Sequence, residues 1–256
     1  MTVNLGQIES ATIQVQVYQR LREALFTGMF APGQSLTIRG LADSLGTSSM
    51  PVRESLQRLV AEHALVQMPN RTFKVTPFTP EMFRELVRVR MTVEGFAAAE
   101  AARRATPRQI ARLADINRSM SASLDEYAPS QVMTSNRDFH FALYEITEMP
   151  QLLDIINGLW LRAGPYLMNA HKSLGDPRAF FRSGVKFHLR VIDACADKDP
   201  RRAARALSCD IWHSARNFRL DVARINDAGQ ANAEKKRRRG ETAAMLKDGH
   251  KWEQAQ

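Results

Sequence analysis

Prolines divide residues 81–220 of this chain into helical runs of similar length. Apolar residues recur at helical spacing over six stretches, at approximately residues 81–105, 107–127, 131–147, 150–171, 177–197 and 200–220. The breaks between them are Thr106-Pro107, Ala128-Pro129, Met149-Pro150, Gly175-Asp176-Pro177 and Asp199-Pro200. Each break places a proline at or near a first helical turn, where its missing N–H costs nothing. Six helices joined by short loops, with no strand signal from Glu81 onward, predict an all-helical antiparallel bundle.

The segment before the bundle has a different pattern. Apolar residues within 17–26 recur at helical spacing and predict a first helix. Thr37 can cap a short second helix, and Gly46 supplies the sharp turn after it. Ser48 or Ser49 then caps a third helix. Two short helices joined at a glycine form the outline of a helix-turn-helix.

Two strand-like runs follow these helices. Residues 65–68 and 72–75 flank Pro69-Asn70-Arg71, which predicts a β-hairpin. Helices followed by a hairpin predict a winged helix-turn-helix, although any small helical domain contains helix pairs. The predicted fold is therefore mainly α, with an N-terminal winged helix-turn-helix and a C-terminal all-helical antiparallel bundle.

This pattern divides the chain into four parts. We expect a winged helix-turn-helix domain at 1–77, a linker at 78–80 that acts as the pivot, and a helical effector-binding and dimerisation domain at 81–222. Residues 223–256 have little periodicity and contain five consecutive basic residues, 235–239. They predict a basic, disordered tail.

Composition excludes several classes of protein. Hydrophobic residues make up 44% of the 256, enough for a packed core, and no run approaches the ~18 apolar residues of a membrane helix. The N-terminus lacks the pattern of a secretory signal, and Cys195 and Cys209 have no metal-type spacing. We expect a cytoplasmic protein with no membrane partner. The net charge of +9 favours a polyanionic partner, but the charge is spread along the chain and locates no site.

Specific motifs then identify a family. The run LADSLGTSSMPVRESLQRLVAEHALVQMPNRTFKV resembles the DNA-binding domain of the GntR family of bacterial transcription regulators. Three later segments resemble the helical, FCD-like ligand-binding domain of its FadR-type branch: RVRMTVEGFAAAEAA, NRDFHFALYEITEMPQLL and FHLRVIDACADKDPRRAARAL. The resemblance covers about residues 12–220. It implies a homodimer that reads a palindromic operator in double-stranded DNA, with the recognition helix in the major groove and the wing tip at the minor groove.

The resemblance also implies which residues bind DNA. Arg39 and Arg53 can reach phosphates or guanine edges, where bidentate arginine contacts carry most discrimination. Ser48 and Ser49 lie at a helix N-terminus, which suits a phosphate. The wing tip consists of Asn70, Arg71 and Thr72.

FadR-type relatives often hold a divalent metal, and the matching residues are present in part. Asn136 and His140 lie four apart on one helix face, and His188 matches a second imidazole. Asp210 stands at the third position, with His213 one turn later as the alternative. Such a set suits Zn, Mn, Ni or Fe. Alternatively, the histidines are satisfied by hydrogen bonds or bind an effector directly.

The implied effector is a small organic or sugar acid. Arg90 can supply a charge-assisted contact to its carboxylate, although an ion pair with Glu94 fits the spacing equally well. The predicted function is a transcription regulator, most simply a repressor, and not an enzyme. Two other functions compete with it, a helical metal-dependent hydrolase and a module that docks proteins instead of DNA. No nucleophile elbow, P-loop or zincin motif supports the hydrolase.

Overall fold

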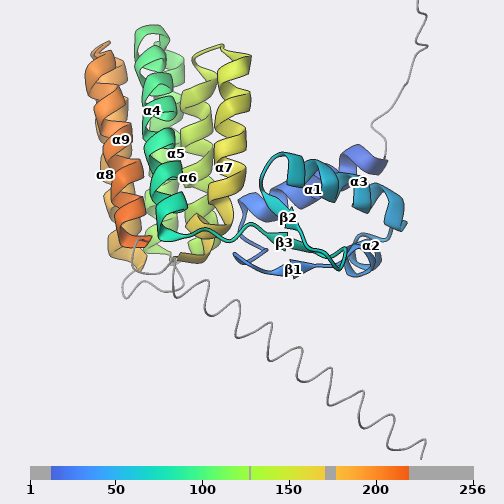
Figure 1. Cartoon of the computed structure of the whole chain (residues 1–256). Coiled ribbons are helices and arrows are strands. Elements are labelled where there is room, and N and C mark those ends of the chain that lie inside the picture. Colours follow the sequence, from blue (N-terminus) through green and yellow to red (C-terminus); the bar gives the residue numbers. More distant parts are fainter. Residues whose placement is uncertain (1–12, 127, 171–176, 219–256) are drawn as a thin grey trace, which may run out of the picture.

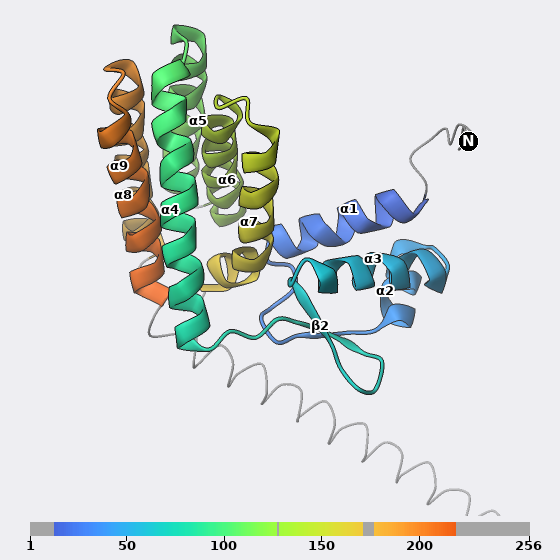
Figure 2. The same ribbon diagram turned by 45° about the horizontal axis from the view of Figure 1, so that its top comes forward.

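The computed structural model describes residues 13–126, 128–170 and 177–218. The chain forms a small N-terminal domain that lies beside one end of a larger helical bundle (Figures 1 and 2). The predicted fold class is confirmed. The tail predicted at 223–256 lies outside the described residues.

Three helices form most of the N-terminal domain: α1 (Ile13–Phe26), α2 (Ile38–Leu45) and α3 (Ser49–Ala61). The Thr37 side chain accepts a hydrogen bond from the Gly40 amide at 3.2 Å, so the predicted cap of α2 is confirmed. Gly46 ends α2 with φ at 63°, in the left-handed region that glycine tolerates best. The turn from α2 to α3 is therefore encoded locally.

A three-stranded sheet completes this domain. Strands β2 (Leu65–Gln67) and β3 (Phe73–Val75) form the predicted hairpin, with Val66 opposite Lys74. A further strand, β1 (Ser35–Leu36), pairs antiparallel with β3, giving the order β1-β3-β2. Sequence reasoning missed β1 because two residues show no alternation.

Each of the six bundle helices begins at a proline. For α5 to α9 these are the prolines of the predicted breaks, whereas α4 begins at Pro80, a residue predicted to lie in the linker. The bundle consists of α4 (Pro80–Arg104), α5 (Pro107–Asp125), α6 (Pro129–Glu145), α7 (Pro150–Ala170), α8 (Pro177–Ala196) and α9 (Pro200–Phe218). Thr79 and Thr106 cap α4 and α5 with their hydroxyl groups, which accept backbone N–H bonds. Within the described residues, no helix is long and apolar enough to cross a membrane.

The two domains meet where α1 ends against α7. A Cβ placed on Gly164 of α7 would lie 2.9 Å from the carbonyl oxygen of Leu25 and 3.1 Å from the Cα of Phe26. Glycine is therefore the residue that permits this close approach. The linker is also held, because Tyr166 donates to the Thr76 carbonyl at 3.1 Å and its ring stacks on buried Phe78.

Candidate functional site

One face of α3 is available to a partner. Ser49, Arg53 and Gln57 follow one another at four-residue spacing and are all exposed, whereas Val52, Leu56 and Leu59 on the other face are buried. The predicted contacts Ser49 and Arg53 thus share a face of the helix. Gln57, which sequence reasoning did not single out, is a further exposed polar side chain on this face.

The N-termini of α2 and α3 add polar groups. Ser48 is the N-cap residue of α3, but its side chain makes no capping hydrogen bond. Arg39 lies in the first turn of α2 and is exposed. Since backbone N–H groups at a helix N-terminus attract anions, both residues stand where a phosphate can bind.

The wing tip is a stiff turn. The side-chain oxygen of Asn70 accepts hydrogen bonds from the Thr72 amide at 3.2 Å and from the Thr72 hydroxyl at 2.6 Å. Arg71 lies between them with φ at 60° and is exposed. Asn70 and Thr72 therefore shape the tip, and Arg71 is the cationic group that it presents.

A cluster of three buried side chains lies inside the bundle. His140 of α6, His188 of α8 and Asp210 of α9 each offer one ligand atom, and these atoms lie within 4.8 Å of one another. The Nε2 atoms of His140 and His188 lie 3.2 Å and 3.7 Å from Oδ2 of Asp210. His188 Nε2 is buried and has no hydrogen-bond partner among the described residues. The three atoms converge on one point although they come from three different helices.

Burial determines the charge of this cluster. It lowers the pKa of His140 to about 4 and that of His188 to about 3, so both imidazoles are neutral at pH 7. Burial also raises the pKa of Asp210, with His188 and Arg90 acting in the opposite direction. A neutral imidazole carries the lone pair that a metal ion requires.

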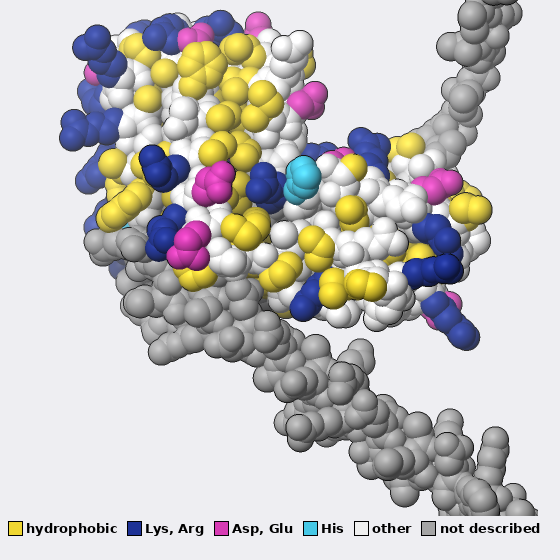
Figure 3. Space-filling model, in the orientation of Figure 1, with side chains coloured by type: hydrophobic (Ala, Val, Ile, Leu, Met, Phe, Trp, Pro, Cys, Tyr) yellow, Lys and Arg dark blue, Asp and Glu magenta, His cyan; other side chains and the backbone are white. Residues whose placement is uncertain are grey.

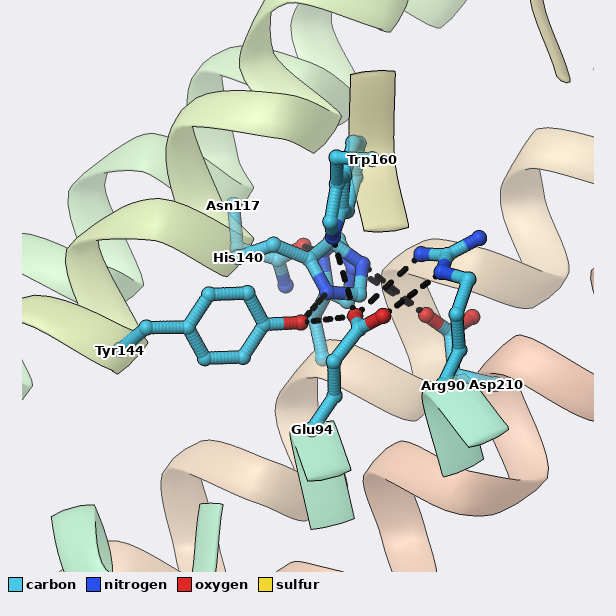
Figure 4. Close-up of polar contacts among 8 residues, drawn as sticks. Arg90, Glu94, Asn117, His140, Tyr144, Trp160 and Asp210 are labelled. Atoms are coloured by element: carbon cyan, nitrogen blue, oxygen red, sulfur yellow. Dashed lines mark hydrogen bonds and ion pairs between the residues drawn. The ribbon is translucent and has the colours of Figure 1, made fainter. Parts of the chain in front are cut away.

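A buried ion pair lies next to the cluster. Arg90 Nε lies 2.6 Å from Glu94 Oε1, and Arg90 Nη2 lies 3.2 Å from Oε2. Glu94 also accepts hydrogen bonds from the Tyr144 hydroxyl and from Trp160 Nε1 (Figure 4). The ion pair, which was the alternative to an effector contact for Arg90, is thus present in the structure.

A cavity of about 40 Å³ opens beside these groups. Its polar lining consists of Arg90, Asn136, His140, Trp160, Asp210 and Ser214. Its apolar lining is provided by Met133, Leu167, Phe180, Phe181 and Ile211. The predicted effector contact and three of the predicted ligands therefore border one space, whereas His188 is not among its lining residues.

The structure distinguishes between Asp210 and His213, the two alternatives for the third ligand. Asp210 faces both imidazoles, whereas His213 is absent from the convergent set of atoms. The ring of His213 instead lies 5.5 Å from that of Phe187 and 6.4 Å from that of Phe180. Asp210 is accordingly the candidate ligand on α9.

Sequence reasoning missed two residues that contact the histidines. Tyr144 Oη lies 2.9 Å from His140 Nδ1, and Asn117 Oδ1 lies 3.1 Å from His188 Nδ1. Tyr144 follows His140 by one helical turn, a spacing that could have indicated it. Asn117 belongs to α5, and no local signal connects it with His188.

A winged helix-turn-helix joined to an all-helical second domain is the architecture of a DNA-binding regulator. Comparison with known families agrees in both domains. Residues 13–75 match the bacterial regulatory proteins of the gntR family, and residues 85–211 match the FCD domain.

Individual relatives give the same result. The chain is 30% identical over 203 residues to the HTH-type transcriptional regulator McbR of Escherichia coli, covering 79% of this chain and 91% of McbR. It is 23% identical over 225 residues to the HTH-type transcriptional repressor RspR of E. coli, covering 86% of this chain and 96% of RspR. The solved structure of E. coli McbR/YncC superposes with a TM-score of 0.72 at 28% identity, covering 86% of this chain and 99% of that one.

The chain belongs to the GntR family and carries an FCD domain. It is a DNA-binding transcription regulator and not an enzyme. This conclusion removes the helical hydrolase and the protein-docking module as alternatives.

Proposed function

We propose that the chain is a homodimeric cytoplasmic repressor whose affinity for a palindromic operator is controlled by a metal ion and a small carboxylate in the FCD domain. The observation that carries the proposal is the convergence of His140, His188 and Asp210 on one buried point. This point lies in the domain that packs against α1 of the DNA-binding domain.

The metal is supported by the chemistry of the donor set. Two neutral imidazoles and a carboxylate suit Zn, Mn, Ni or Fe. At metal–ligand distances of about 2.1 Å, ligand atoms of a tetrahedral site are about 3.4 Å apart, comparable with the 3.2 Å and 3.7 Å found here. The partnerless Nε2 of His188 supports the same conclusion, because a buried lone pair without a partner is costly. Asn136 lines the adjoining cavity and would complete the ligand set.

The carboxylate effector is supported by the position of Arg90. Its guanidinium borders the same cavity as the proposed ligands, so an anion can contact both. A cavity of about 40 Å³ admits a carboxylate head group but not a bulky ligand, since one water needs about 10–15 Å³. A small organic or sugar acid fits these limits.

The route from the cavity to DNA is supported by contacts between the domains. Trp160 lines the cavity, its ring lies 5.4 Å from Phe141, and Phe141 packs edge-on at 6.4 Å from Phe26 of α1. A ligand that binds more tightly to one packing of these rings would shift the equilibrium between two positions of the DNA-binding domain. The mechanism is a population shift between two arrangements of the domains.

The homodimer is supported by the exposed face of α4. Met82, Val89 and Phe96 recur at seven-residue intervals and are 42%, 42% and 48% exposed. Charged residues flank this stripe, among them Glu85 and Arg88, and Figure 3 shows hydrophobic and charged side chains mixed on the face that α4 presents. A heptad stripe with neighbouring charges of both signs suits self-association of two identical helices. The proposed occupant is a second copy of the chain.

Operator binding is tested by selection from random DNA followed by fluorescence anisotropy. We expect one palindromic sequence to be enriched, and its binding to weaken steeply between 50 and 200 mM salt, because phosphate contacts release counterions. Arg53→Ala should cost about 1–3 kcal/mol on that sequence. Arg112→Ala removes the same charge from α5 and should leave the affinity unchanged. Failure to enrich any sequence, or equal effects of the two variants, would contradict the proposal.

A further inference from the structure

The hydrogen bonds made by Nδ1 of His140 and of His188 determine which nitrogen of each imidazole carries the proton. A neutral imidazole has one protonated nitrogen and one lone pair, and its partners decide which nitrogen is which. Only the nitrogen with the lone pair can bind a metal ion. The partner of Nδ1 is the Tyr144 hydroxyl at His140 and the Asn117 side-chain oxygen at His188. Whether each partner can donate a proton to the ring decides the tautomer.

At His140, the limit comes from a single hydroxyl proton. Tyr144 Oη lies 2.9 Å from His140 Nδ1 and 2.5 Å from Glu94 Oε2. Glu94 is fully buried and accepts two hydrogen bonds from Arg90, as an ionised carboxylate does. The hydroxyl must therefore donate its one proton to Glu94, because two bare oxygens at this distance would repel. Tyr144 can then only accept from His140, so the proton of His140 is on Nδ1.

At His188, the limit comes from the orientation of an amide. Asn117 Nδ2 donates to the carbonyl oxygen of Val185 at 3.2 Å, which orients the side chain. Its Oδ1 consequently faces His188 Nδ1 at 3.1 Å and can only accept. The proton of His188 is also on Nδ1. Both Nε2 lone pairs then face Asp210, at 3.2 Å and 3.7 Å from Oδ2. Such a set of acceptors is favourable only when a cation, or a proton on Asp210, lies between them.

We propose that Tyr144 and Asn117 are positioning residues that lock His140 and His188 in the Nδ1-protonated tautomer, so that both Nε2 lone pairs face Asp210. Glu94 contributes to this positioning because it accepts the hydrogen bond that orients the Tyr144 hydroxyl. Arg90 in turn holds Glu94 in place through their ion pair. The inference rests on the proposed metal site for its purpose, but the tautomers themselves exist with or without a metal. Buried partners of this kind fix ring orientation and increase metal affinity.

The tautomers are observed directly by ¹⁵N NMR of the imidazole nitrogens in the full chain, treated with chelator and then loaded with Zn²⁺. We expect a protonated Nδ1 and an unprotonated Nε2 for both histidines before Zn²⁺ is added. In Tyr144→Phe, His140 should populate both tautomers while His188 is unchanged. Asn117→Leu removes the acceptor, so His188 should populate both tautomers. Asn117→Asp keeps an acceptor oxygen, so His188 should stay protonated on Nδ1. A wild-type His140 or His188 protonated on Nε2 would overturn the inference.

Zn²⁺ affinity, measured by competition with a chromophoric chelator, gives the second readout. Tyr144→Phe should weaken binding about 10- to 100-fold. The matched control is Tyr166→Phe, which removes an equally buried hydroxyl near the linker and should leave the affinity unchanged. Equal affinities for Tyr144→Phe and the wild type would overturn the positioning role. A wild-type chain with the expected tautomers but without Zn²⁺ binding would instead contradict the proposed metal site and leave the tautomer assignment standing.

Discussion

Glu23 and Arg137 form an ion pair that joins the two domains, with Oε1 of Glu23 2.8 Å from Nη1 of Arg137. Glu23 belongs to α1 of the DNA-binding domain, and Arg137 belongs to α6. Arg137 is adjacent to Asn136, which lines the cavity, and it precedes the candidate ligand His140 by three residues. This direct contact is the route by which, under the proposed function, a change in the position of α6 at the cavity would reach α1.

Arg137→Gln should weaken this coupling without affecting the cavity. We expect Zn²⁺ affinity to be unchanged and the ratio of operator affinities with and without Zn²⁺ to move toward one. Coupling free energies between sites are typically about 1–3 kcal/mol, so the change is measurable by anisotropy titration. Arg118→Gln is the control, because it breaks an exposed pair with Asp115 inside α5. If both variants keep the wild-type ratio, the ion pair does not transmit the signal.

Gly164→Ala should disturb the junction between the domains. The added methyl group would meet backbone atoms of Leu25 and Phe26, which cannot rotate away, so we expect a loss of about 1–3 kcal/mol in unfolding free energy. Gly158→Ala on the same helix meets no atom within 4 Å and should stabilise the chain by roughly 0.5–1 kcal/mol. Urea unfolding compares the two. A Gly164→Ala variant as stable as the wild type would show that α1 does not pack against α7 at this position.

Glu94→Gln should strongly destabilise the bundle. It removes the charge that compensates Arg90 in a site where both side chains are almost completely buried, at a cost of about 3–5 kcal/mol. Asp115→Asn breaks an exposed pair and should cost less than about 1 kcal/mol. Similar midpoints for the two variants in urea would mean that the Arg90–Glu94 pair is not buried in solution.

Phe96→Glu should dissociate the proposed dimer. The new charge would lie in the apolar stripe of α4, and burying it at the interface without a partner is unfavourable. Light scattering should give twice 28.9 kDa for the wild type and 28.9 kDa for the variant. Ile155→Glu, at a 55% exposed position of α7, should remain dimeric. A dimeric Phe96→Glu chain would place the interface elsewhere.

Features with local causes could be predicted from the sequence. The six bundle helices begin where prolines stand, and the turn between α2 and α3 follows from Thr37 and Gly46. The hairpin follows from two strand-like runs that flank the turn residues Pro69-Asn70-Arg71. Capping, proline geometry and glycine conformation act within a few residues, so they leave a readable signal.

The candidate site depends on packing between helices, and its details could not be predicted. Asp210 and His213 lie one turn apart on α9, and only the rotation of α9 against α4 decides between them. That rotation is fixed by close packing at Gly95, where a Cβ would lie 2.9 Å from Ser208 Oγ, and by the Ser208 hydrogen bond to the Met91 carbonyl. Contacts of this kind join residues more than 100 positions apart, so no sequence window contains them.

The central claim is that the buried site controls DNA binding, and one measurement tests it most directly. Operator affinity is measured by anisotropy for the chelator-treated chain and at saturating Zn²⁺, in the wild type and in Asp210→Ala. The account predicts wild-type affinities that differ at least fivefold between the two conditions, and no difference in Asp210→Ala. Equal wild-type affinities, with Zn²⁺ shown to be bound, would contradict control of DNA binding by this site.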